Sequence, residues 1–344
     1  GEDKRPAKPN VLLMLVDDLG WQDVVCYDLD EPCPYETPNL DKLAKRGVLF
    51  RNGYSPAPVC SPSRCAIMSG KHPARTMSTT VASGKPLSAF HPQNSFIAPW
   101  CRGGMDTKEI TIAEALKLNG YRTGHVGKWH IAIQHYAFPQ PSDEGFDFTS
   151  HYAGNPQARG VQNGMPNRLD SFASRKSEDP YRLDEAGFPR DHVTEEALRF
   201  LSENKNSPFF LYYASWLVHS PLQSRSQELL RKYCEKLGVD YPTNPKGWLL
   251  EGQRNPYYCA MVESLDHYIG KMLKYLERTD DPRWPGHKLV ENTYLVFTSD
   301  NGGMEGHHEE VFTDNLPLDK GKIYIREGGI RVPFIIAGPN IPSA

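Results

Sequence analysis

The sequence predicts an α/β fold with a large, mostly parallel central sheet flanked by helices. Residues 11–16 (VLLMLV) and 209–214 (FFLYYA) are continuous apolar runs, which is typical of strands buried on both faces. Such runs alternate along the chain with segments of helical periodicity, as in α/β proteins. The 344 residues fit one large domain or two ordinary ones, and we expect one domain over residues 1–344.

The individual elements are predicted from hydrophobic periodicity and from residues that end helices. A helix over residues 111–118 should stop at Asn119-Gly120, and residues 257–276 place Met261, Leu265, Ile269 and Met272 on one helical face. In chain order, the expected elements are a strand at 11–16, a first helical turn at 66–69, a helix at 111–118, a strand at 121–126, a helix at 192–201, a strand at 209–214, a helix at 257–276, and strands at 294–298 and 332–337.

Two stretches resist this pattern. Residues 76–106 and 134–191 are rich in Pro, Gly, Ser, Asn and Arg, and they show no periodicity. Irregular segments of that length in a compact domain are usually functional or disordered. They are therefore either solvated connections or walls that face a substrate.

Composition excludes several classes of function. The hydrophobic share of 39% and the charged share of 24% describe a globular protein, and a net charge of −3 gives no support to nucleic-acid binding. No apolar run approaches the ~20 residues that span a bilayer, so we expect no membrane span. The seven cysteines lack paired zinc spacing and leave the redox compartment undecided.

Two pairs of residues with oxygen-bearing side chains follow expected strands. Asp17-Asp18 comes directly after residues 11–16, and Asp300-Asn301 comes just after residues 294–298. The carboxyl ends of strands in open α/β sheets form the ligand crevice, and oxygen ligands suit a hard cation such as calcium or magnesium. The alternative is helix capping and turn formation, which the same residue types favour.

Cationic and nucleophilic side chains follow other elements. Cys60 opens the segment CSPSR (60–64) just ahead of an expected helical turn, whose free N–H groups favour an anion. The segment GKWH (127–130) carries Lys128 and His130, His219 follows the strand at 209–214, and Lys322 lies in a loop. Taken singly, each also fits a buried cysteine, a surface lysine or a structural histidine.

Taken together and in this order, these motifs resemble the type I, formylglycine-dependent sulfatases of the alkaline-phosphatase superfamily. The resemblance runs from Asn10 to about Gly338 and ends on EGGIRVP (327–333). Its most specific element is Cys-x-Pro-x-Arg with the following Ser69-Gly70 and Arg75.

The resemblance implies a role for each matching residue. A maturation enzyme would oxidise Cys60 to formylglycine, whose hydrate is the nucleophile, and Arg64 and His130 would steady that hydrate. Lys128, His219 and Lys322 would hold the sulfate, with His219 or Lys322 assisting the leaving alcohol. A divalent cation, calcium or alternatively magnesium, would be bound by Asp17, Asp18, the modified Cys60, Asp300 and Asn301. Lys320 competes with Lys322, but the five-residue interval from Lys322 to Glu327 favours Lys322.

The function implied is a sulfuric ester hydrolase that removes sulfate from a sulfated carbohydrate, in polysaccharide degradation, in a periplasmic or secreted protein. Arginine forks recognise anions and aromatic rings cover sugar faces. On that basis the expected substrate contacts are Tyr152, Arg159, Arg168, His307 and His308.

Two alternatives stay open. One is a phosphodiesterase or phosphonate hydrolase of the same superfamily, and the other is a catalytically silent glycan-binding homologue. The family's smaller C-terminal antiparallel sheet is not expected here, because the sequence stops at Ala344.

Overall fold

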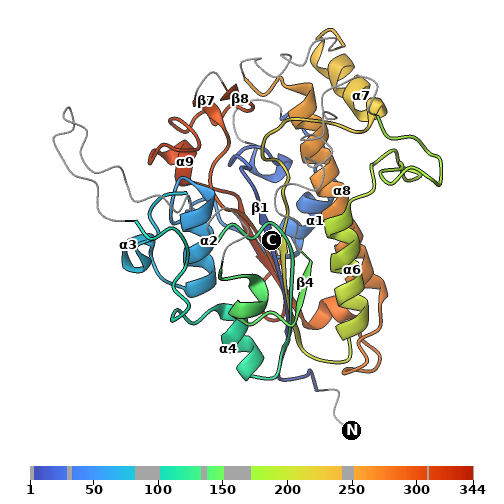
Figure 1. Ribbon diagram of the computed structural model, residues 1–344. Coiled ribbons are helices and arrows are strands. Elements are labelled where there is room, and N and C mark those ends of the chain that lie inside the picture. The colour runs from blue at the N-terminus through green and yellow to red at the C-terminus, as the bar shows by residue number, and fades with distance from the viewer. Residues whose placement is uncertain are drawn as a thin grey trace, which may run out of the picture.

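A seven-stranded sheet organises the chain (Figure 1). The computed structural model describes residues 4–28, 33–81, 101–132, 138–150, 172–241, 252–307 and 310–343. The strand order is β2-β9-β6-β1-β5-β3-β4. The strands are β1 (Asn10–Val16), β2 (Val48–Leu49), β3 (Arg122–Gly127), β4 (Phe148–Ser150), β5 (Phe209–Ala214), β6 (Thr293–Ser299) and β9 (Phe334–Ala337). All neighbours pair in parallel except β6 with β9 and β9 with β2, which confirms the mostly parallel sheet.

Helices cover both faces of this sheet. In chain order they are η1 (Val25–Tyr27), α1 (Pro38–Arg46), α2 (Cys60–Ser69), α3 (Pro73–Thr76), α4 (Ile112–Leu118), η3 (Pro141–Glu144), α6 (His192–Asn204), α7 (Gln227–Leu237), α8 (Pro256–Arg278), η5 (Leu289–Asn292) and α9 (Glu327–Ile330). A separate two-stranded ribbon pairs β7 (Glu305–His307) with β8 (Glu310–Val311). Within the described segments, no helix is both long enough and apolar enough to cross a membrane.

The side chains of β1 alternate between two hydrophobic layers, as the period of a strand requires. Leu12, Met14 and Val16 pack in the layer that holds α1, α6 and α8, whereas Leu13 and Leu15 pack in the layer that holds α2 and α4. In Figure 1, α2 and α4 accordingly lie on one side of the sheet, and α6 and α8 lie on the other. A strand buried on both faces needs the continuous apolar run that predicted it.

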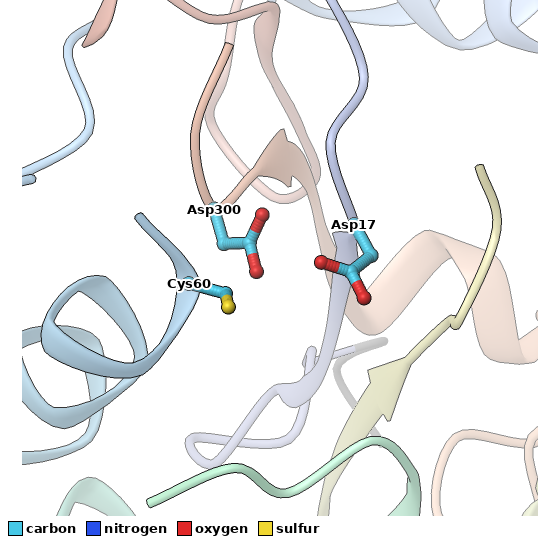
Figure 2. A group of neighbouring side chains, drawn as sticks. All are labelled: Asp17, Cys60 and Asp300. Atoms are coloured by element: carbon cyan, nitrogen blue, oxygen red, sulfur yellow. The ribbon is translucent and has the colours of Figure 1, made fainter. Parts of the chain in front are cut away.

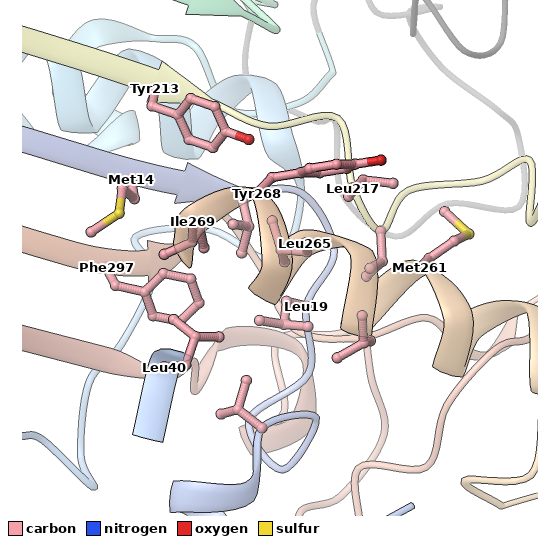
Figure 3. Packing of buried hydrophobic residues seen from close by; sticks show 14 of the residues in the cluster. Met14, Leu19, Leu40, Tyr213, Leu217, Met261, Leu265, Tyr268, Ile269 and Phe297 are labelled. Atoms are coloured by element: carbon pink, nitrogen blue, oxygen red, sulfur yellow. The ribbon is translucent and has the colours of Figure 1, made fainter. Parts of the chain in front are cut away.

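Helix α8 is the main support on its side. Its predicted apolar face is confirmed, because Met261, Leu265, Ile269 and Met272 are all buried in one cluster with side chains of the sheet. Figure 3 shows Leu265 and Ile269 of this face beside Phe297 of β6. Each such side chain contributes roughly 1.5–3 kcal/mol by leaving water. Asn255 caps the helix by accepting hydrogen bonds from the first-turn N–H groups. The hydroxyl of Tyr258, in the first turn of α8, donates to the Asp18 carbonyl at 3.4 Å and so links the start of the helix to the residues that follow β1.

Several elements differ from the sequence prediction. Helix α2 begins at Cys60 itself and not near residue 66, because Pro62 falls in the first turn, where a helix tolerates proline. The short elements η3 and β4 lie within residues 138–150, inside a stretch expected to be irregular. Helices α1 and α7 were not predicted, although both carry strong apolar faces against α8.

Candidate active site

The carboxyl ends of β1 and β6 place two acids next to each other. The register pairs Val16 with Ser299, and the N–H of Asp300 donates to the carbonyl of Val16 at 3.1 Å. Asp17 and Asp300 therefore leave adjacent strands at the same level, and their carboxylates point into one space (Figure 2). Both are fully buried.

Cys60 reaches this space from the first turn of α2. Its thiol sulfur and one carboxylate oxygen each of Asp17 and Asp300 all lie within 4.8 Å of one another. The Sγ atom lies 3.1 Å from Nδ1 of His130, and the residue is 3% exposed. Burial raises the pKa of the thiol, while the charges of Lys128 and Lys322 act in the opposite direction. The N-cap residue of α2, Val59, makes no side-chain capping hydrogen bond, and Cys60 is the first residue of the helix, so the positive end of α2 lies beside the Cys60 thiol.

The segment after β3 needs unusual backbone. Gly127 has φ +93°, and a Cβ atom there would lie 2.0 Å from the carbonyl oxygen of Ala214. His130 has φ +54°, a left-handed conformation that is uncommon for residues other than glycine. These two residues turn the chain so that Lys128 and the ring of His130 meet the ends of β1 and α2.

Two lysines form ion pairs with the two aspartates that follow β1. The ammonium of Lys128 lies 2.5 Å from Oδ2 of Asp17, and the ammonium of Lys322 lies 2.6 Å from Oδ2 of Asp18. His219, which follows β5, has Nε2 at 3.6 Å from the same Asp18 oxygen. Three cationic or ionisable side chains from distant segments thus surround one pair of carboxylates.

Arg64 holds the carboxylate of Asp300 in place. Its Nε and Nη2 atoms both lie 2.8 Å from Oδ2 of Asp300, and Nη1 donates to the Lys128 carbonyl at 3.2 Å and to the Tyr212 hydroxyl at 3.4 Å. Nη2 also lies 3.7 Å from Oδ1 of Asp17, so Arg64 contacts both acids, whereas the side chain that contacts the Cys60 sulfur is His130. The guanidinium fork is suited to holding a buried carboxylate in place.

The pKa values of the two adjacent acids, Asp17 and Asp300, shift in opposite directions. Burial by itself raises the pKa of Asp17, but Lys128, His219, Arg64 and Lys322 outweigh it and hold that pKa well below its usual range. Burial and the charge of Asp17 raise the pKa of Asp300 to about 7. Two carboxylates this close and this buried favour a shared cation.

Free oxygens at this site fit a hard cation. Among the described residues, Oδ1 of Asp17 and Oδ1 of Asn301 are buried and accept no hydrogen bond, and the Asp17 atom has only the longer ion-pair contact with Nη2 of Arg64, at 3.7 Å. Asn301 is fixed by its amide, which donates to Oδ1 of Asp18 at 2.7 Å. Buried acceptors without hydrogen bonds are costly, and a divalent cation bound by oxygens would satisfy both.

The structure thus brings together all ten of the predicted catalytic and metal-binding residues, namely Asp17, Asp18, Cys60, Arg64, Lys128, His130, His219, Asp300, Asn301 and Lys322. Lys320 lies exposed, with its ammonium 5.7 Å from the ring of Tyr324. The predicted substrate contacts Tyr152, Arg159, Arg168 and His308 lie outside the described residues, and only the backbone of His307 is described, in β7.

Sequence reasoning missed two aromatic residues at this site. The hydroxyl of Tyr212 on β5 accepts from Arg64 at 3.4 Å, and Trp216, which follows β5, lies with its ring centroid 5.3 Å from the ammonium of Lys128. For Trp216 the available signal was position, because a residue just beyond the end of a predicted buried strand falls in the crevice. Tyr212 lies within the strand, and no such signal marks it.

Comparisons with known proteins agree with this geometry. The family model described as Sulfatase matches residues 9–344. Human N-acetylgalactosamine-6-sulfatase is 33% identical over 100% of this chain and 59% of its own length. N-acetylgalactosamine-6-O-sulfatase of Bacteroides thetaiotaomicron is 26% identical over 96% of this chain and 68% of its own length. The crystal structure of Ps i-CgsB with k-i-k-neocarrahexaose superposes with a TM-score of 0.68 at 28% identity, covering 98% of this chain and 67% of that chain. The chain thus spans about 59% of the length of the first of these relatives.

Proposed function

We propose, from the premise that this chain belongs to the sulfatase family, that the protein hydrolyses sulfate esters of a sulfated carbohydrate. One observation carries the proposal. The buried Cys60 lies at the positive end of α2, beside His130, with two carboxylates and two lysine ammonium groups around it. This arrangement can hold both a nucleophile and the anion that it attacks.

The thiol of Cys60 marks the position of the nucleophile. Oxidised to formylglycine and hydrated, residue 60 would supply an oxygen nucleophile where Sγ now lies, and a maturation enzyme would have to act on it first. His130, at 3.1 Å from Sγ, is placed to accept or donate a proton at that position. Arg64 contributes indirectly, because it fixes Asp300.

Lys128, Lys322 and His219 form the anion-binding wall. Cleavage of a sulfate ester builds negative charge on the sulfuryl group and on the departing oxygen, and fixed cations stabilise that charge as it develops. Burial lowers the pKa of His219 although Asp18 acts against it, so its imidazole is suited to proton exchange with the leaving alcohol. Lys322 is the other candidate for that exchange.

Calcium, or alternatively magnesium, would be held by Asp17, Asp18, Asp300, Asn301 and residue 60. The free oxygens of Asp17 and Asn301 support that assignment. Such a cation would supply further positive charge near the developing anion.

The carbohydrate part of the proposal is supported by the relatives. Two are named for a sulfated amino sugar, and the solved structure holds a neocarrahexaose. The expected sugar contacts Tyr152, Arg159, Arg168, His307 and His308 remain proposals. A screen of aryl sulfates, sulfated glycans, phosphodiesters and phosphonates tests this choice. Fastest cleavage of sulfated glycans is expected, whereas faster cleavage of phosphodiesters or phosphonates would favour the superfamily alternative.

Conversion of Cys60 is tested separately by mass. Change of the thiol to the aldehyde removes about 18 Da from the peptide that contains residue 60, and the step is essential because the hydrated aldehyde supplies the oxygen nucleophile. Unconverted Cys60 together with glycan binding and no turnover would favour a silent glycan-binding protein. We also propose a periplasmic or secreted location, which cell fractionation tests, because polymeric substrates lie outside the cell.

A further inference from the structure

We propose that Trp216 is a positioning residue that holds the ammonium of Lys128 at the site through its aromatic face. This inference rests on the proposed function, in which Lys128 meets the sulfate group. Its starting observation is the ring of Trp216, whose centroid lies 5.3 Å from Nζ of Lys128. A cation within about 6 Å of an indole face is attracted by the negative face of the ring.

Sheet topology puts Trp216 where it can act. Strand β5 lies between β1 and β3, so the loop after β5 emerges between Asp17 and Lys128. The N–H of Lys128 donates to the Ala214 carbonyl at 2.8 Å, which joins the ends of β3 and β5. The loop that carries Trp216 therefore borders both partners of the Lys128–Asp17 ion pair.

Backbone hydrogen bonds fix this loop to Asp17. The N–H of Asp17 donates to the Leu217 carbonyl at 3.0 Å, and the N–H of Val218 donates to the Asp17 carbonyl at 2.7 Å. A further bond from the N–H of His219 to the Trp216 carbonyl, at 3.1 Å, closes the turn. These bonds hold the backbone of Trp216 in place relative to Asp17 and His219.

Burial makes the ring matter energetically. Lys128 is 1% exposed and Trp216 is 7% exposed, so the ammonium has little water around it. Among the described residues, this ammonium contacts the Asp17 carboxylate and the indole face of Trp216. A buried cation is costly unless such partners compensate for lost hydration, and a cation–π contact is stronger where water is excluded. The ring therefore keeps the charge directed at the site.

The competing explanation is that Trp216 only fills space in the core. Fluorination distinguishes the positioning role from simple space filling, because fluorine withdraws electron density from the face of the indole while changing its shape little. We would place tryptophan with none, one, two or three fluorines at position 216 and measure kcat/KM on a sulfate ester and the Kd for inorganic sulfate. Each added fluorine is expected to weaken both, to a total loss of roughly 3- to 30-fold. Values independent of fluorine would overturn the proposal.

Two controls sharpen the result. In a Lys128→Met background, the fluorine series should leave sulfate affinity flat, because no cation remains for the ring to hold; the same decline there would contradict the proposal. Trp284 stacks on His287 and has Arg5 at 5.7 Å, and its neighbour Arg283 donates to Oδ1 of Asn10 at the start of β1, the end opposite the site. The same fluorines at position 284 should change neither quantity.

The outcomes also separate this proposal from the proposed function. Sulfate binding that depends on fluorine, without turnover of any sulfate ester, would sustain the role of Trp216 and contradict the sulfatase function. Turnover of a sulfate ester that is insensitive to fluorine would support the sulfatase function and contradict the role of Trp216. A wild-type protein that neither binds nor cleaves would overturn both, because the role of Trp216 requires Lys128 to meet sulfate.

Discussion

The sulfur of Cys60 lies 3.1 Å from Nδ1 of His130, although 70 residues separate them in the chain. The contact exists because α2 begins at Cys60 and because the left-handed backbone of His130 turns its ring back toward the end of the sheet. A reactive atom and a group that can exchange its proton are thereby fixed on two different elements.

Cys60→Ala is expected to abolish sulfate ester turnover and to leave the fold intact, because the change removes the nucleophile and only a small volume. Activity and a thermal melt of the same sample check both halves. Cys65→Ala is the matched control, since Cys65 is buried on the same helix and contacts Ser78. That control should keep its turnover; near-native turnover by Cys60→Ala would contradict the mechanism.

Lys322→Ala should lower kcat by roughly 10²–10³, the loss expected when one preorganised charge-stabilising group is removed. Its ammonium is 2.6 Å from Asp18 and the residue is 6% exposed. Lys320→Ala should behave as wild type, because Lys320 lies exposed beside Tyr324. Steady-state kinetics of the two variants decide, and a crippled Lys320→Ala with a normal Lys322→Ala would reverse the assignment.

Strands β1 and β6 and the acids that follow them could be predicted from the sequence. A continuous apolar run such as residues 11–16 has few other interpretations. Parallel strands bring their carboxyl ends to one edge of the sheet, so the sequence alone could place Asp17 near Asp300. The motif order then supplied the remaining catalytic positions through the resemblance.

Other features depend on contacts that no local pattern contains. Helix α1 begins after Thr37, whose side chain caps nothing, and the Asp266 carboxylate on α8 accepts the N–H groups of Asn39 and Leu40 instead. The link between Arg64 and Asp300 and the position of Trp216 over Lys128 likewise depend on strand order. Such tertiary contacts become visible only once the sheet is assembled.

Calcium should raise the melting temperature of the wild-type protein, because a ligand that binds only the folded state stabilises it by about 2.7 kcal/mol at 100 times Kd. The rise should disappear in Asp18→Asn, which removes one proposed ligand charge, and after treatment with EDTA. Differential scanning calorimetry with calcium and with magnesium measures the effect.

The control for this metal titration is Asp184→Asn. Asp184 pairs with His267 and Lys271, away from the proposed metal ligands, so its loss should leave the calcium response unchanged. An equal calcium response in the wild-type protein and in Asp18→Asn would refute the grouping of ligands.

Glu144 should make the stability of the protein fall as pH rises. The residue ends η3 and is 1% exposed, and among the described residues its Oε1 atom has no hydrogen-bond partner. Burial, with Glu114 and Asp143 nearby, raises its pKa from 4.5 to about 8. The folded state therefore binds this proton more tightly than the unfolded state does. Its stabilising contribution is complete below pH 4.5 and is lost as pH rises toward 8.

Glu144→Gln isolates that contribution, because glutamine keeps the shape and cannot ionise. Between pH 5 and 8, the free energy of unfolding of the wild-type protein should fall relative to that of the variant by on the order of 2–3 kcal/mol. Comparing slopes cancels any constant cost of the amide. Urea titrations across this range measure it, and Glu178→Gln, on an exposed loop, should keep the wild-type slope. Parallel curves for the wild-type protein and Glu144→Gln would mean that Glu144 ionises in the folded protein as freely as in the unfolded chain.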